Sequence, residues 1–174
     1  MFLLGAVVFV ELSDRVKDIP PSGIRRFFEL AEEKDDVISL GVGEPDYSAP
    51  WPARNAAIDS LERGLTSYTT NRGRRELRTA IASHVDRYDL EYDPETEILV
   101  TTGVSEGVDL AMRALVNRGD TVAVAEPSYI SYVPTVRFSD GTPLSVPTLP
   151  KDDFQLTYER LAEAGAERAD LLVM

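Results

Sequence analysis

The first half of the chain has the spacing of apolar residues that is typical of helices. Side chains that recur every three or four residues lie on one face of an α-helix and can be buried together. Glycine and proline mark where such helices begin and end. These signals predict three helices: one after Ser22 that carries Ile24, Phe27, Phe28 and Ala31, one over residues 52–63 that Gly64 ends, and one that carries Leu77, Ile81, Val85 and Tyr88.

Between these helices the sequence predicts one strand and two loops. Residues 37–40 (VISL) form a short apolar run that is typical of a strand. Residues 41–52 hold too many glycines and prolines for regular structure, and residues 67–73 have the composition of a second loop. Because long loops in compact domains are often functional, residues 41–52 are a candidate for ligand binding.

Short apolar runs alternate with helical segments from residue 98 onward. This alternation is typical of an α/β fold, in which helices cover both faces of a mainly parallel sheet. Ligand sites of such sheets lie in the loops that follow the strands, whereas the last predicted strand runs to the end of the sequence, so we expect a fragment of a larger domain. The predicted strands are 98–102, 121–125, 144–146 and 171–174, and the predicted helices are 105–117, 127–138 and 157–164.

Composition and charge narrow the classes of partner. The chain has 174 residues, of which 43% are apolar, enough for one packed domain and part of a second. Acidic residues outnumber basic ones by 30 to 18, which gives a net charge of −12. Nucleic-acid binding needs a basic face, so we expect no nucleic-acid partner. The acid excess fits either a well-solvated surface or adaptation to high salt, and both interpretations stay open.

The scarcity of metal-binding side chains excludes several kinds of site. The chain has no cysteine, which excludes disulfides, thiolate metal sites and cysteine nucleophiles. Its single histidine, His84, excludes a centre with several histidine ligands, and we interpret it as a surface residue of a helix. We therefore expect no metal site.

The first ten residues (MFLLGAVVFV) form an apolar segment. A membrane span needs roughly 20 such residues, and a secretory signal usually carries basic residues before its apolar part. We interpret the segment as an extension of the chain, with an exported anchor as the alternative. We accordingly expect no membrane partner and a cytoplasmic location.

Three segments have residues that suit a small anionic ligand. In residues 101–107 (TTGVSEG) a glycine turn precedes a predicted helix, whose first N–H groups and Ser105 hydroxyl suit a phosphate, although neither G-x-G-x-x-G nor a P-loop is present. Tyr129 follows the next predicted strand, where its ring could lie against a flat cofactor. Glycines in residues 41–46 allow close approach of a ligand to the backbone. For residues 101–107 an ordinary glycine turn is an equal alternative. Taken singly, Tyr129 is better explained as a packing aromatic residue, and residues 41–46 as a tight turn.

Together these segments resemble the aspartate-aminotransferase-like family (class I and II), whose members are fold type I enzymes that use pyridoxal 5′-phosphate (PLP). Tyr68, Gly73, Leu77 and Arg78 match the family pattern Y-x-x-x-x-G-x-x-x-L-R, while Tyr47 stands where the family usually has Phe. The resemblance runs from residue 12 to the end of the chain. Its matching segments are residues 20–28, 38–47, 68–78, 98–107 and 119–132.

The resemblance implies a fold and a division into domains. Residues 51–174 would be the N-terminal half of the PLP-binding large domain, with a mainly parallel sheet and helices on both faces. Residues 12–50 would be an N-terminal arm and a segment of the small domain, and residues 1–11 an apolar extension. In the family, the remainder of both domains comes later in the chain, so we expect this chain to be truncated.

The resemblance also implies roles for six residues. The cofactor phosphate would bind at the helix start, the Tyr129 ring would stack on the pyridine, and Tyr68 would reach the phosphate of the partner subunit's cofactor in a homodimer. The backbone of Gly43 would approach the substrate carboxylate. Many relatives have Gly, Ser or Ala at the position of Val104, but donation by a backbone N–H does not depend on the side chain. The implied phosphate-binding residues are Gly103, Val104 and Ser105.

No lysine of this chain is placed to hold PLP as a Schiff base. The only three are Lys17, Lys34 and Lys151, and each has carboxylates beside it in the sequence. Carboxylates keep a lysine protonated, whereas a Schiff-base lysine has to lose its proton. We therefore assign no catalytic residue in this chain.

The family activity implied is transfer of an amino group from an amino acid to a 2-oxo acid, and we expect the chain alone to be inactive. A non-catalytic module that binds a phosphate ligand, or that pairs with a separate C-terminal half, is the alternative. Carbon–sulfur lyase and aminocyclopropane-carboxylate synthase chemistry within the family also stays open, as does the identity of the amino acid.

Overall fold

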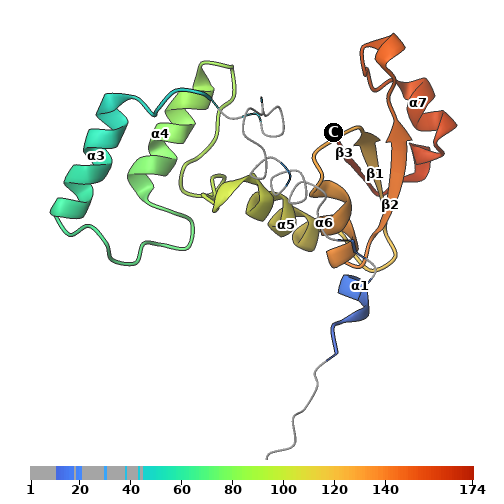
Figure 1. Cartoon of the computed structure of the whole chain (residues 1–174), viewed down its shortest axis with the longest axis horizontal. Helices are drawn as coiled ribbons and strands as arrows, with labels where there is room; N and C mark the ends of the chain where they lie inside the picture. The colour runs from blue at the N-terminus through green and yellow to red at the C-terminus, as the bar shows by residue number, and fades with distance from the viewer. Residues whose placement is uncertain (1–10, 18, 21–29, 31–37, 39–42, 44) are drawn as a thin grey trace, which may run out of the picture. The chain divides into compact units, whose positions relative to one another are not determined.

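The computed structural model describes residues 11–17, 19, 20, 30, 38, 43 and 45–174 of the chain (Figure 1). The described residues belong to two compact units, which are treated separately below. One contains residues 103–174 with the described part of 1–23, and the other contains the described part of 24–102. The helix predicted after Ser22, except for Leu30, and the strand predicted at 37–40, except for Ile38, lie outside the described residues.

A three-stranded parallel sheet forms the centre of the unit that contains residues 103–174. Strand β1 (Thr121–Glu126) lies between β2 (Thr142–Pro147) and β3 (Leu171–Val173), in the order β2-β1-β3. In register, Val124 of β1 pairs with Ser145 on one side and with Val173 on the other. A central parallel strand is buried on both faces, which is why β1 is a continuous run of small and β-branched apolar residues.

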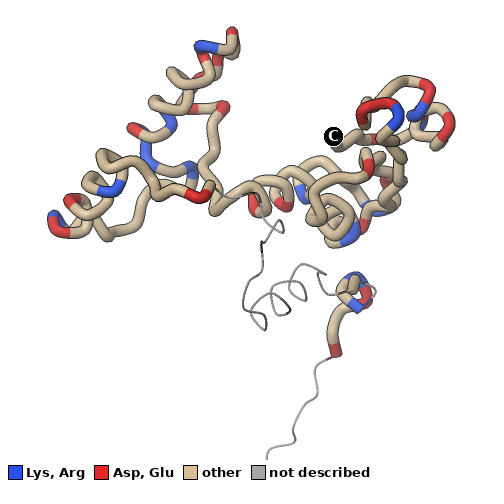
Figure 2. Tube along the Cα trace, turned by 45° about the horizontal axis from the view of Figure 1, so that its top comes forward, with Lys and Arg blue, Asp and Glu red and all other residues tan. Residues whose placement is uncertain are grey.

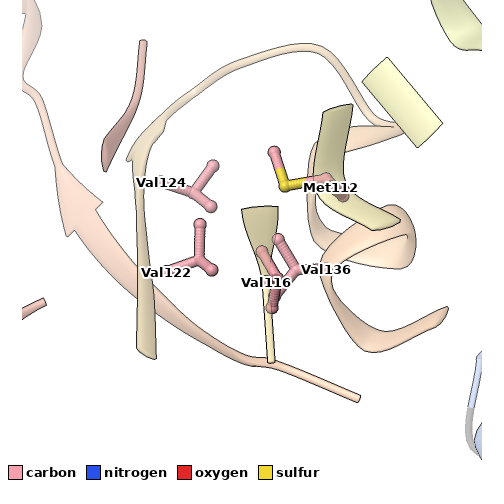
Figure 3. Packing of buried hydrophobic residues seen from close by; sticks show 5 residues of the cluster. All are labelled: Met112, Val116, Val122, Val124 and Val136. Carbon is pink, nitrogen blue, oxygen red and sulfur yellow. The ribbon is translucent and has the colours of Figure 1, made fainter. Parts of the chain in front are cut away.

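One face of the sheet is covered by helices α5 (Gly103–Leu115) and α6 (Tyr132–Phe138). Alternate residues of a strand point to opposite faces, so Val122 and Val124 share the face that these helices cover. Figure 3 shows these two valines from β1 facing Met112, Val116 and Val136 on the helical side of the cluster.

The opposite face of the sheet is covered by α7 (Tyr158–Glu163) and the short helix η2 (Ala166–Arg168). Ala123 of β1 packs there with Val146 and Ala166. Thr157 caps α7 by accepting a hydrogen bond from the Arg160 N–H, and Gly165 follows the helix in the left-handed conformation. A third short helix, η1 (Pro150–Asp152), precedes this region. The prediction of a parallel sheet with helices on both faces is confirmed.

The structure differs from the sequence prediction at three places. Residues 98–102 form no strand, although strands were predicted there and at β1. A strand requires a backbone partner, and the backbone N–H of Val100 instead donates to the carbonyl of Arg72 at 3.1 Å. The helix predicted from residue 127 begins only at Tyr132, and a short helix α1 (Asp14–Lys17) forms where no pattern indicated one.

The second unit contains α3 (Trp51–Glu62) and α4 (Arg75–Asp86), so the two helices predicted there are confirmed. Tyr88 lies just beyond the end of α4. Arg78 of α4 is 5% exposed, and its guanidinium donates to the carbonyls of Gly73 and Pro94. These bonds tie the loop before α4 to the segment that follows it.

Charged residues of both signs are interspersed along the trace (Figure 2). Many of their ion pairs are local, such as Arg113 with Asp109 at 2.7 Å and Arg63 with Asp59 at 3.2 Å. Exposed pairs of this kind contribute little to stability, about 0–1 kcal/mol each. Among the described residues, no helix combines the length and the apolar character that crossing a bilayer requires.

Gly73 is expected to be the glycine of the second unit that tolerates substitution least. Its φ is +89°, and an added Cβ would lie 2.6 Å from the Cβ of Val100. We expect Gly73→Ala to lower the free energy of unfolding by about 2–4 kcal/mol, from backbone strain and overpacking together. Gly64→Ala is the matched control, since its φ is +68° with nothing within 4 Å, and backbone strain alone predicts a loss of about 1–2 kcal/mol.

Denaturant unfolding followed by the fluorescence of Trp51, the chain's only tryptophan, measures both variants in the unit that contains them. Equal losses for the two variants would contradict the close packing of Val100 on Gly73.

Candidate functional site

The start of helix α5 is the element on which the candidate site is built. Gly103 begins the helix with a φ of +79°, a conformation that favours glycine, and nothing lies within 4 Å of the position its Cβ would take. The first N–H groups of an α-helix have no acceptor within the helix and point along its axis, where the helix dipole is positive. Val108 and Met112 pack into the core, so the direction of this axis is set by the sheet beneath.

The structure brings two of the residues predicted for the site into direct contact. The hydroxyl oxygens of Ser105 and Tyr129 lie 2.7 Å apart, a hydrogen-bond distance, although the residues are 24 positions apart in the sequence. Tyr129 follows the carboxyl end of β1, and Ser105 is in the first turn of α5. The contact therefore places the start of α5 at the edge of the sheet where ligands of α/β folds bind.

The side chain of Tyr129 contacts one aromatic ring and two serine hydroxyl groups. Its ring meets the ring of Tyr132 edge-on, with centroids 5.6 Å apart and planes at 84°. Hydrogen bonds from the side chains of Ser105 and then Ser131 lower the pKa of the Tyr129 phenol below its ordinary value, because they stabilise the phenolate. The side chain is 44% exposed, so part of its ring surface is available to a ligand.

The donors at this site are neutral or come from the backbone. Val104 is 70% exposed, so its side chain takes no part in the core, and its contribution to a ligand would be its N–H group. The one charged side chain in the first turn of α5 is the carboxylate of Glu106. A set of N–H and O–H donors at the positive end of a helix fits a phosphate group, which is itself only an acceptor once ionised.

Two other residues predicted for the site belong to the second unit and are described there alone. Tyr68 has a fully exposed side chain in the loop between α3 and α4. That loop is closed by hydrogen bonds between Thr70 and Gly73, including one from the Thr70 hydroxyl to the Gly73 carbonyl at 2.8 Å. Gly43 has nothing within 4 Å of the position of an added Cβ. Their roles stay predictions.

The two described lysines have carboxylates beside them, as the sequence predicted. Lys17 forms ion pairs with Asp14 at 3.0 Å and with Glu11 at 3.4 Å. Lys151 lies in η1 and is followed by Asp152. Lys34 falls outside the described residues. In the part of the chain that the structure describes, no three His, Cys, Asp or Glu residues are grouped so that they could hold a metal ion.

The hydrogen bond between Ser105 and Tyr129 is a feature of the site that sequence reasoning missed. The two residues were selected separately, one as a phosphate donor and the other for its ring. Both segments follow predicted strands, and the carboxyl ends of parallel strands meet at one edge of a sheet. Because residues 98–102 form no strand, this signal holds for Tyr129 alone. Contact between two particular hydroxyl groups depends on side-chain conformations that no sequence pattern reports.

A family model and individual known proteins both show that this chain is similar to aminotransferases. The family model described as aminotransferase class I and II matches residues 35–174. The aspartate aminotransferase of Pyrococcus abyssi is 36% identical over 164 residues, covering 94% of this chain and 42% of that protein. The aromatic-amino-acid aminotransferase 2 of Thermococcus litoralis is 33% identical over 164 residues, with the same coverage of 94% and 42%.

Solved structures are similar as well. The structure of the aspartate aminotransferase from Thermus thermophilus with maleate matches with a TM-score of 0.85 and 34% identity, covering 95% of this chain and 44% of that one. The chain thus spans less than half the length of these relatives.

We expect two tyrosines of the unit containing residues 103–174 to titrate on opposite sides of the ordinary phenol pKa of 10.0. The pKa of Tyr129 is lowered by its hydroxyl partners, whereas the pKa of Tyr158 is raised because its hydroxyl donates to the Glu167 carboxylate at 2.6 Å. Difference titrations of phenolate absorbance, wild type against Tyr129→Phe and against Tyr158→Phe, isolate each group.

Ser105→Ala should move the Tyr129 transition to higher pH and leave that of Tyr158 in place. If Ser105→Ala leaves the Tyr129 transition where it was, the two hydroxyl groups are not bonded in solution.

Proposed function

Because this chain belongs to the aminotransferase class I and II family, we propose that it supplies the phosphate-binding part of a PLP-dependent aminotransferase. The observation that carries the proposal is the contact between Ser105 and Tyr129 at 2.7 Å. It joins the residue expected to bind the phosphate to the residue expected to pack against the ring of the same cofactor. PLP carries its phosphate and its pyridine ring a short distance apart, so one ligand would need both residues close together.

Each site residue has a stated task in this proposal. The N–H groups of Gly103 and Val104 and the N–H and hydroxyl of Ser105 bind the phosphate, and the ring of Tyr129 packs on the pyridine. When bound, PLP supplies an electron sink for the carbanion that forms at the α-carbon of an amino acid. The backbone of Gly43 approaches the carboxylate of the substrate.

The proposal extends to the whole enzyme only in general terms. Its substrates are an amino acid and a 2-oxo acid, and it acts as a cytoplasmic homodimer in which Tyr68 reaches the phosphate of the partner subunit's cofactor. The relatives above are named for aspartate and for aromatic amino acids, so their names support no narrower substrate class. Residues 51–174 supply the N-terminal half of the large domain, residues 12–50 a segment of the small domain, and residues 1–11 an extension.

A non-catalytic module that pairs with a separate C-terminal half is the second candidate. The three-stranded sheet among the described residues favours it, because β2 and β3 each have one backbone edge without a neighbouring strand. Unpaired edges are sites where a further strand can add. Mixing the chain with the C-terminal half of a relative distinguishes the two candidates: restored amino transfer supports part of an enzyme, whereas association without amino transfer supports the non-catalytic module.

We expect the chain to bind pyridoxamine 5′-phosphate more tightly than pyridoxamine, which lacks the phosphate. Pyridoxamine compounds carry no aldehyde and form no adducts with surface lysines. Gly103→Ala should weaken binding of the phosphate compound by about tenfold, because strain in the turn displaces donors that are worth about 1.5–3 kcal/mol to a charged group. Isothermal titration calorimetry gives both dissociation constants.

Gly119→Ala is the matched control for Gly103→Ala. Gly119 has a φ of +93° with nothing within 4 Å, so its substitution causes the same kind of backbone strain away from the proposed donors. Equal dissociation constants for pyridoxamine and its phosphate would contradict a phosphate site at α5.

We also expect the purified chain alone to transfer no amino group from amino acids to 2-oxoglutarate. Lys17 forms ion pairs with two carboxylates, and Lys151 is followed by Asp152, so both lysines are kept protonated. A coupled assay for glutamate tests this expectation, with a full-length relative as the positive control. Turnover by the pure chain that disappears when Lys17, Lys34 or Lys151 is changed to Ala would overturn the assignment of no catalytic lysine.

A further inference from the structure

Each hydroxyl group of the pair carries one proton, but only one of these two protons can lie between the two oxygens. A serine or tyrosine hydroxyl has one proton to donate and lone pairs that accept. At 2.7 Å, either Ser105 donates to Tyr129 or Tyr129 donates to Ser105. In the first arrangement the serine proton is used within the pair. In the second it stays available to another acceptor.

A bound phosphate would select the second arrangement. An ionised phosphate accepts hydrogen bonds, so Ser105 can bind it only by directing its single proton to a phosphate oxygen. The oxygen of Ser105 is then left with lone pairs that face Tyr129. The two hydroxyl groups form a directed series, from the tyrosine to the serine and from the serine to the phosphate, and bonds in such a series polarise and strengthen one another.

Both hydroxyl groups are carried by elements that are anchored in one core. Ser105 is on α5, which packs through Met112, and Tyr129 precedes α6, which packs through Val136. Tyr132, whose ring holds the ring of Tyr129 edge-on, also packs against that cluster. The pair is therefore formed by the fold itself, and little conformational entropy remains to be lost when a ligand binds.

On the premise of the proposed function, we propose that the Tyr129 hydroxyl is a positioning group of the phosphate site. It donates to Ser105 Oγ and thereby turns the serine proton toward the phosphate. Tyr129 thus serves the ligand twice, through its ring against the pyridine and through its hydroxyl by way of Ser105. A phenylalanine at this position would keep the first contribution and lose the second.

A double-mutant cycle tests this role on the full chain. The quantity measured is the dissociation constant of pyridoxamine divided by that of pyridoxamine 5′-phosphate, which isolates the contribution of the phosphate. We expect Tyr129→Phe to reduce this ratio by about threefold to tenfold, the value of one hydrogen bond. In a Ser105→Ala background, Tyr129→Phe should have no further effect, because no serine proton is left to direct.

Two variants serve as controls. Ser105→Thr keeps a hydroxyl group, so the effect of Tyr129→Phe should persist in that background. Tyr158→Phe removes another exposed, hydrogen-bonded tyrosine hydroxyl of the same unit and should leave the ratio unchanged. Thermal unfolding of each variant establishes that it is folded before binding is measured.

The outcomes separate this inference from its premise. If the wild-type ratio exceeds one but Tyr129→Phe leaves it unchanged, or acts equally with and without the Ser105 hydroxyl, the positioning role is wrong and the phosphate site stands. If the two dissociation constants are equal for the wild type, the proposed phosphate site is wrong, and the positioning role of Tyr129 is overturned with it.

Discussion

The burial of β1 on both faces is the constraint from which the rest of the unit follows. Val122, Ala123 and Val124 are at most 1% exposed, and alternation along the strand sends the valines to one face and the alanine to the other. Removing one such valine from water contributes about 1.5–3 kcal/mol. That gain is available only if helices cover both faces, which requires α5 and α6 on one side and α7 on the other. The layered architecture is therefore a direct consequence of a six-residue strand.

The candidate site depends indirectly on the packing of α5 and α6 against β1. Neither the start of α5 nor the segment after β1 forms a site by itself, since each contributes one hydroxyl group to the pair. What holds the two together is the cluster of Met112, Val122, Val124 and Val136 beneath them (Figure 3). A polar pair on the edge of a sheet is in this way positioned by apolar contacts several residues away.

The sequence predicted those features that have a local physical cause. The apolar run of β1, the end of α3 before Gly64 and the helix at residues 157–164 each depend on signals within a few residues, and each is seen in the structure. The strand predicted at 98–102 failed because an apolar run indicates burial but not a backbone partner. At the site, the sequence selected Ser105 and Tyr129 separately, through the resemblance and their places after strands. Their hydrogen bond is a tertiary feature, and the roles of Tyr68 and Gly43 stay predictions.

Neutral hydrogen-bond donors also explain how an acidic chain could bind a phosphate dianion. A chain with a net charge of −12 repels a phosphate dianion at long range, and the first turn of α5 adds the carboxylate of Glu106. That repulsion is screened over a Debye length of about 8 Å at physiological ionic strength and over about 3 Å in molar salt. Hydrogen bonds from N–H and O–H groups act at contact distance and are reduced far less by salt. An acidic surface and an anion site built from backbone and hydroxyl donors are thus compatible: rising salt weakens the opposing field of the surface and leaves the donors in place. A site built on exposed lysines would behave in the opposite way, because the same screening would weaken the attraction that formed it.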